Sequence, residues 1–238
     1  MTITADARVG DIALEHPQTM RFLESQGVDF CCHGQRSLRE ACAAAGRPLE
    51  EVEAALAALV AAPTELLKPG DWSTRPLPDL LDHIVASHHA YLRAELPRLD
   101  ALLTKVHGVH GANHPELDEV HDLFQQLAMD LVPHLMKEEQ ILFPFIRQLA
   151  TGGAAEACFA TVQSPIHVME AEHDEVGHLL ATLRRITGGY TAPADGCASY
   201  QALYRGLQAL EEDTHLHICL ENQVLHPRAV ALEAALQR

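Results

Sequence analysis

Apolar residues recur at alternating steps of three and four along most of the chain, which is the periodicity of amphipathic helices. Four long segments of this kind lie at about 77–106, 116–150, 164–187 and 197–236. The loops between them contain glycine and proline, which interrupt helices. Long amphipathic helices with shortish connections predict an all-α protein whose main part is an up-down-up-down four-helix bundle.

Shorter helical patterns precede the bundle and predict a small helical domain over residues 1–62. A helix is expected within 11–26, and the capping box from Ser37 to Glu40 indicates the start of another. Residues 63–76 are rich in proline and are expected to be a linker. The bundle then occupies residues 77–238.

Composition supports the helical prediction and excludes several classes of function. The 238 residues are 47% hydrophobic but only 5% aromatic, which disfavours β-sandwiches and barrels. The formal net charge of −16 disfavours binding to nucleic acid or to an anionic membrane. No apolar stretch is long enough to span a bilayer, and the N-terminus lacks a secretory pattern. Six scattered cysteines indicate reduced thiols, so we expect a cytoplasmic protein.

Polar residues of the metal-ligand type interrupt each of the four apolar stripes. One histidine falls on every stripe, and two stripes add a glutamate four residues later; the six residues are His89, His134, Glu138, His173, His217 and Glu221. A buried imidazole or carboxylate without a partner costs several kcal/mol. Six such groups that converge in one bundle therefore predict a shared metal centre.

The ligand count favours two metal ions over one. Histidine and glutamate four residues apart share a helix face, so both can reach one centre. If both carboxylates bridge two ions, each ion has two imidazoles and two carboxylate oxygens. An oxo or hydroxo bridge would leave one open position on each ion, where a small diatomic molecule could bind.

An internal duplication supports this symmetry. The segment from His134 to Pro144 aligns without gaps with the segment from His217 to Pro227, 83 residues later. The single histidines of the other two helices, His89 and His173, keep nearly the same offset. A repeated pair of helices predicts a dinuclear site with pseudo-twofold symmetry.

The chain resembles the RIC (repair of iron centres) di-iron family, whose bundle is hemerythrin-like. The resemblance covers nearly the whole chain and is carried by the four motifs Asp29-Phe-Cys-Cys-His-Gly34, His134–Pro144, Val168–Glu175 and Leu220–Leu225. It implies iron ligands at the same six positions that the stripes select. One departure is His226, where the family often has an aromatic residue such as Phe143 of the first repeat.

Several residues near the expected site have alternative interpretations. His88 could replace His89 as the ligand if the first helix is rotated by one residue. Asp130 and Asp213 precede ligand histidines by four residues and could hydrogen bond to them or could simply face solvent. Cys31 and Cys32 could be a redox pair, a metal or partner contact, or buried structural cysteines.

The family resemblance implies a role in nitrosative and oxidative stress. The protein would hold two iron ions with an oxo or hydroxo bridge and would repair damaged iron–sulfur proteins, with nitric oxide binding at the di-iron site. Alternatives are a reversible nitric oxide or dioxygen binding module and a nitric oxide reductase. The sequence assigns no catalytic residue and leaves open whether the protein is an enzyme. A homodimer is also left open.

Overall fold

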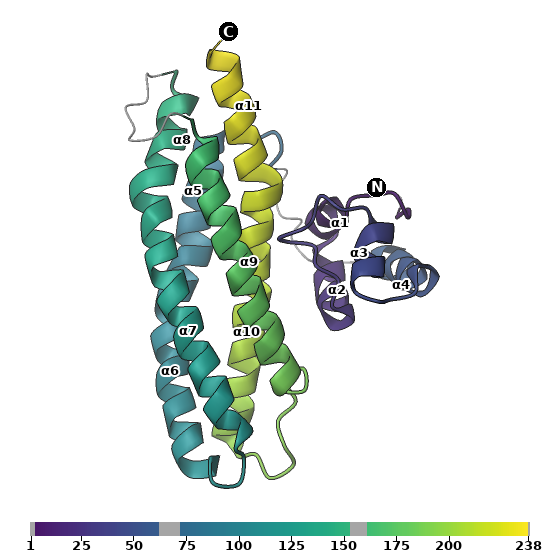
Figure 1. Ribbon diagram of the computed structural model, residues 1–238, viewed down its shortest axis with the longest axis vertical. Helices are drawn as coiled ribbons and strands as arrows, with labels where there is room; N and C mark the ends of the chain where they lie inside the picture. Colours follow the sequence, from purple (N-terminus) through teal and green to yellow (C-terminus); the bar gives the residue numbers. More distant parts are fainter. Residues whose placement is uncertain (1–2, 62–71, 153–160, 238) are drawn as a thin grey trace. The chain divides into compact units, whose positions relative to one another are not determined.

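The computed structural model describes residues 3–61, 72–152 and 161–237, and its regular elements are helices (Figure 1). Within these ranges no β-strand forms, and only Arg8 and Ser37 make an isolated bridge. The all-α prediction is confirmed. Most of the expected linker, up to residue 71, lies outside the described residues. None of the described helices has the length and apolar character needed to cross a membrane.

The chain divides into two compact units, of which one is continuous and covers Leu81–Thr214. This unit is a bundle of four helical arms. The arms in chain order are the end of α5 (Leu77–Ile84) with η2 (Val85–His89) and α6 (Ala90–His110), α7 (Glu116–Lys137) with η3 (Glu138–Leu142) and α8 (Phe143–Ala150), α9 (Gln163–Ile186), and α10 (Ala198–Leu220) as far as Thr214.

Side chains from all four arms fill the interior of this bundle. α7 packs against both α6 and α9. Gly206 lets α10 approach α6 closely, because a Cβ atom there would lie 2.5 Å from Cδ2 of Leu99. The buried Glu211 on α10 pairs with Arg184 on α9 at 2.7 Å, which satisfies its charge. The apolar residues of the predicted stripes form most of this core.

Prolines occur both within continuous helices and at equivalent positions of the repeat. Pro97 and Pro133 lie inside helices that continue past them. Pro144 and Pro227 each follow a π-helical turn, η3 and η4 (Glu221–Leu225). Proline lacks an N–H group and clashes with the carbonyl four residues earlier, so a wider turn before it relieves both problems. These two π-helical turns lie at equivalent positions of the repeat and support the duplication, whereas the π-helical turn η2 has no counterpart in α9.

The wide turn changes which residues face the core. Helical periodicity places Ile141 on the buried stripe of the second arm, but its side chain is 47% exposed and Leu142 is buried instead. A π-helical turn contains one extra residue, so the apolar stripe moves by one position beyond Glu138. A fixed helical period therefore predicts the wrong core residue at this turn.

The second unit combines residues from both ends of the chain, Met1–Leu80 and His215–Arg238. Its N-terminal helices are α1 (Val9–Glu15), η1 (Pro17–Thr19), α2 (Met20–Gln26), α3 (Leu38–Ala44) and α4 (Leu49–Ala61). The helix expected over 11–26 is divided at His16 and Pro17. The predicted capping box is present, because Ser37 and Glu40 each bind the backbone N–H of the other.

The C-terminal segment of this unit contains the end of α10, η4 and α11 (His226–Leu236) and contacts the N-terminal helices. Nδ1 of His215 lies 3.0 Å from Oε1 of Glu24. Nη2 of Arg228 donates to the carbonyl of Arg75 at 2.6 Å. The sequence predicts a domain over 1–62, a linker over 63–76 and a bundle over 77–238, each a continuous segment. This compact unit instead combines segments from both ends of the chain.

Candidate metal centre

Four of the six expected ligands come together inside the unit Leu81–Thr214. His89 ends η2, His134 lies near the end of α7, Glu138 begins η3, and His173 lies in the middle of α9. All four side chains are buried, with exposed fractions of 1% or less. Three arms of the bundle therefore supply imidazole and carboxylate groups to one region of its interior.

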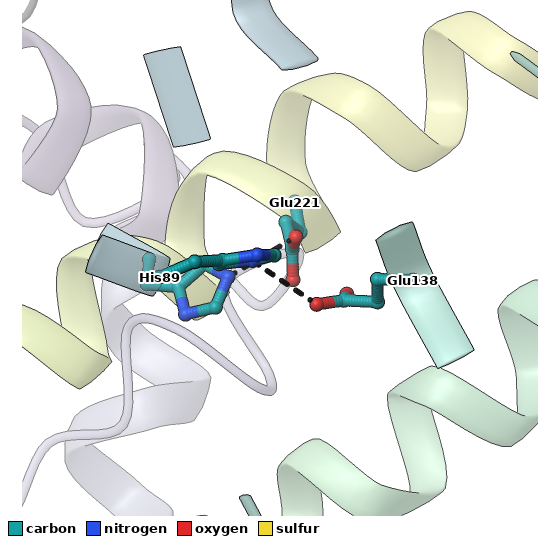
Figure 2. Close-up of side chains that lie close together, drawn as sticks. His89, Glu138 and Glu221 are labelled. Atoms are coloured by element: carbon teal, nitrogen blue, oxygen red, sulfur yellow. Dashed lines mark ion pairs between the residues drawn. The ribbon is translucent and has the colours of Figure 1, made fainter. Parts of the chain in front are cut away.

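Glu138 faces two of these histidines with its two oxygens. Oε2 lies 3.3 Å from Nε2 of His89, and Oε1 lies 3.4 Å from Nε2 of His134. Figure 2 shows the His89 ring and the Glu138 carboxylate directed toward each other. Two groups of possible ligand atoms, each within a 4.8 Å span, share Glu138; one contains His89 and the other contains His134 and His173. This is the arrangement of a carboxylate that can bridge two ions.

His134 and His173 present their ring nitrogens to the same point. Their Nε2 atoms are 3.1 Å apart. Nδ1 of His134 lies 2.9 Å from Oε2 of Glu172, so the proton is assigned to Nδ1 and Nε2 carries a lone pair. Two nitrogens each about 2.1 Å from one ion, at roughly a right angle, would lie about 3.0 Å apart. The pair therefore fits a cation between them.

Carboxylates behind the histidines fix the orientation of the rings. Nδ1 of His89 lies 2.7 Å from Oε1 of Glu139, and Arg93 holds the same oxygen at 2.8 Å. Glu172 likewise holds Nδ1 of His134 with one oxygen, and Lys137 donates to the other oxygen of Glu172. A carboxylate on Nδ1 selects the tautomer that leaves Nε2 available to a metal and makes the imidazole a stronger donor.

Both outer carboxylates are held in the ionised form. Burial raises the pKa of Glu139, but hydrogen bonds from Arg93 and His89 outweigh this effect and leave the pKa below its ordinary value. The pKa of Glu172 is also lowered, because bonds from Lys137 and His134 outweigh its burial. Ionised carboxylates accept hydrogen bonds only, so both can serve the histidine rings as acceptors.

Sequence reasoning missed Glu139 and Glu172. Each adjoins a ligand in the chain, but one residue of a helix rotates the side chain by about 100°, so neither lies on the apolar stripe. Each serves a histidine of another arm: Glu139 on η3 serves His89, and Glu172 on α9 serves His134. The sequence signal was an acidic residue directly beside a ligand, since Glu139 follows Glu138 and Glu172 precedes His173.

The remaining two expected ligands, His217 and Glu221, form the corresponding pair of the second repeat. Nε2 of His217 lies 3.2 Å from Oε1 of Glu221, and both side chains are buried. They belong to the unit that contains both chain ends. They also continue a helix face on which Leu210 and Thr214 are buried, within the continuous helix α10 and the π-helical turn that follows it.

The structure also gives the contacts of His88, Asp213 and Asp130, the residues near the site that the sequence left open. His88 turns toward Asp213, with Nδ1 3.0 Å from Oδ1, while the neighbouring His89 faces Glu138. Asp130 accepts hydrogen bonds from Gln126, at 2.9 and 3.0 Å.

Phe143, which is replaced by His226 in the second repeat, also contacts a residue of the site. Phe143 stacks on the His89 ring with a centroid distance of 5.6 Å. Its counterpart in the second repeat, His226, is buried. Cys31 and Cys32 lie in the unit that joins both chain ends, together with Asp29.

Comparison with known families agrees with this geometry. The hemerythrin HHE cation binding domain matches residues 80–229, and a domain of unknown function named ScdA_N matches residues 5–60. The first match covers more than half of the chain and defines a hemerythrin-type cation-binding protein, in which clusters of histidine and glutamate are consistent with a site for two metal ions.

Individual relatives identify the family within the hemerythrin-type proteins more closely. The chain is 39% identical over 231 residues to the iron–sulfur cluster repair protein YtfE of Escherichia coli O157:H7, covering 96% of this chain and 98% of that relative. The YtfE proteins of Citrobacter koseri and Shigella boydii are 38% and 39% identical over the same share of each chain. The protein therefore belongs to the RIC family of YtfE-type proteins.

Proposed function

We propose that this protein holds two iron ions, linked by an oxo or hydroxo bridge, in its histidine and glutamate centre and supplies iron for the repair of damaged iron–sulfur proteins. Nitric oxide would bind at the same centre, and the clients would be cytoplasmic proteins. The observation that carries the proposal is the ligand set of His134, His173 and Glu138 within one compact unit. Two histidines and one carboxylate are typical of non-haem iron(II) sites with open positions.

The second ion follows from the shared carboxylate and from the repeat. Glu138 also faces His89, so a second ion on its other oxygen would have an imidazole ligand. His217 and Glu221 occupy the equivalent positions of the second repeat and lie on the buried stripe of α10 and η4. With these two residues each ion would have two imidazoles and a share in two carboxylates. Iron bound in this way offers open coordination positions to a small diatomic molecule.

The protein's own residues prepare the ligands before a metal arrives. Glu139 and Glu172 hold His89 and His134 with Nε2 toward the centre. Phe143 covers one face of the His89 ring and limits its rotation. Donors that are already buried and oriented favour tight binding.

A reconstitution experiment tests the proposal. An iron–sulfur enzyme whose cluster has been destroyed by nitric oxide is mixed with the iron-loaded protein, inorganic sulfide and a reductant, and the return of enzyme activity is followed. We expect faster recovery than with an equal concentration of free iron(II). Glu138→Ala should abolish the effect, while Glu119→Gln, an exposed change on α7, should not.

Three outcomes would overturn the repair function. Recovery at the rate given by free iron(II) would mean that the protein does not supply iron. Consumption of nitric oxide over many turnovers, without recovery of the client, would assign a reductase, and recovery of unchanged nitric oxide would assign a reversible binding module. Metal analysis of the same samples shows whether the centre was loaded.

A further inference from the structure

A third group of possible ligand atoms lies outside the histidine and glutamate centre. One carboxylate oxygen of Asp29 and the Sγ atoms of Cys31 and Cys32 all lie within 4.8 Å of one another. The three residues occupy the turn between α2 and α3. Cys31 is buried and Cys32 is half-buried, while the Asp29 side chain is 39% exposed, so the group is partly open to solvent.

The sulfur atoms are spaced as ligands of one ion rather than as a disulfide. They are 3.7 Å apart, whereas bonded sulfurs lie about 2.05 Å apart. Two thiolates each about 2.3 Å from one tetrahedral ion would be separated by about 3.8 Å. Sγ of Cys31 lies 3.6 Å from Oδ1 of Asp29, and the corresponding sulfur–oxygen edge of such a site is about 3.5 Å. Both measured edges match a tetrahedral cation site.

Backbone and side-chain contacts hold the three donors in place. Oδ1 of Asp29 accepts the backbone N–H groups of Cys31 and Cys32 at 3.1 and 3.0 Å. Oδ2 of the same carboxylate lies 2.7 Å from Nδ1 of His33. A donor set that is already ordered loses little conformational entropy when it binds an ion.

Negative charge makes a cation favourable here. Hydrogen bonding to the Cys32 thiol, burial, and the charges of Cys32 and Asp29 all raise the pKa of Cys31. A bound divalent ion would offset this repulsion and stabilise both thiolates. The two thiol protons would be released to solvent, and no electrons would be transferred.

We propose that Asp29, Cys31 and Cys32 form a second cation site for one thiophilic divalent ion of the Zn²⁺ or Fe²⁺ type, with its fourth position open to solvent. The same turn is tied to the helix that carries Glu221. The carbonyl of Cys31 accepts hydrogen bonds from Asn222 at 3.4 Å and Gln223 at 3.1 Å. The use of the site in passing iron to a client rests on the proposed function, whereas the site itself does not.

Titration of the iron-loaded full-length protein with Cd²⁺ tests the site. We expect one Cd²⁺ per chain in addition to the bound iron, with ultraviolet absorption from sulfur-to-cadmium charge transfer. Cys32→Ser, a change at a half-buried position, should remove most of this absorption. Asp29→Asn should weaken Cd²⁺ binding by about tenfold or more, as loss of a ligand or its support does at other metal sites.

Cys197→Ser is the matched control, because Cys197 is an exposed thiol in the other unit. This variant should bind Cd²⁺ as the unchanged protein does. Equal absorption in the unchanged protein and in Cys32→Ser, or no absorption in the unchanged protein, would overturn the proposal. Iron content and client recovery are measured on the same samples, so failure of this site is distinguished from failure of the repair function.

Discussion

Oε2 of Glu138 lies 3.3 Å from Nε2 of His89, while the other oxygen of the same carboxylate faces His134. Because one residue serves both groups of ligands, we expect Glu138→Ala to lose both metal ions. His173→Ala removes a ligand from one group only and should retain at least one ion. Metal analysis of the purified variants measures this difference directly.

The repeat makes a companion prediction for Glu221. It is the counterpart of Glu138 and should be equally sensitive to replacement by alanine. Full occupancy by two ions in either glutamate variant would contradict the bridging role. Circular dichroism of each variant provides the control for folding.

The carboxylates behind the histidines should affect metal affinity without contacting the metal. We expect Glu172→Gln and Glu139→Gln each to weaken iron binding by about 10- to 100-fold, because an amide is a weaker acceptor for the imidazole N–H. Asp130→Asn is the control, because Asp130 bonds to Gln126 instead. Competition with a chelator measures the affinities. Equal affinity in all three variants would show that ring orientation does not limit binding.

The shift at the π-helical turn predicts opposite results at two neighbouring positions. Leu142→Ala should lower the free energy of unfolding by about 2–5 kcal/mol, because it removes a buried side chain. Ile141→Ala should change it by only about 0.5 kcal/mol, because Ile141 faces solvent. Urea denaturation compares the two. A larger loss at Ile141 would mean that an ordinary α-helix continues through this region.

Gly34 tests the packing of the Cys31–Cys32 turn. A Cβ atom at this position would lie 2.4 Å from the carbonyl oxygen of Phe30 and 2.7 Å from Nε2 of Gln223. We therefore expect Gly34→Ala to destabilise the protein by about 1–3 kcal/mol.

Gly108→Ala is the matched control for this change, since nothing lies within 4 Å of its added Cβ and α6 favours alanine over glycine. It should leave the thermal midpoint unchanged or raise it. Equal midpoints for Gly34→Ala and the unchanged protein would contradict the close packing of the turn.

Cys197 should be the most reactive of the cysteines that the structure describes. Two hydrogen bonds lower the pKa of Cys197 to about 7. The larger effect comes from the backbone of Tyr200 and the smaller from the side chain of His110. The thiolate forms above this pKa, so its alkylation rate should rise with pH and reach half of its plateau near pH 7. Mass spectrometry of iodoacetamide-treated protein measures the rate at each cysteine.

Replacement of His110 by asparagine should move this midpoint toward the ordinary thiol pKa of about 8.5. The buried Cys42, whose pKa is raised by burial, should react more slowly at every pH. An unchanged midpoint in the His110 variant would show that the histidine does not lower the pKa of Cys197.

Sequence periodicity alone determined the helical class, the four apolar stripes and the choice of His134 and Glu138 as interior residues. This was possible because helical periodicity relates spacing in the chain directly to a side of the helix. The ungapped repeat added the equivalence of Glu138 and Glu221, which the two π-helical turns reproduce. Four sequence motifs also carried the family resemblance, which the comparisons confirmed.

Tertiary structure decided the features that depend on neighbours distant in the chain. Glu172 serves His134 because α9 packs against α7, and no spacing within one helix encodes that pairing. The exchange of Ile141 for Leu142 in the core came from a local change in helix width that a fixed period does not describe. Gln223 reaches Cys31 only because the two ends of the chain meet in one unit. Periodicity reports which side of a helix is apolar, whereas the identity of the atoms facing that side is set by how the helices pack.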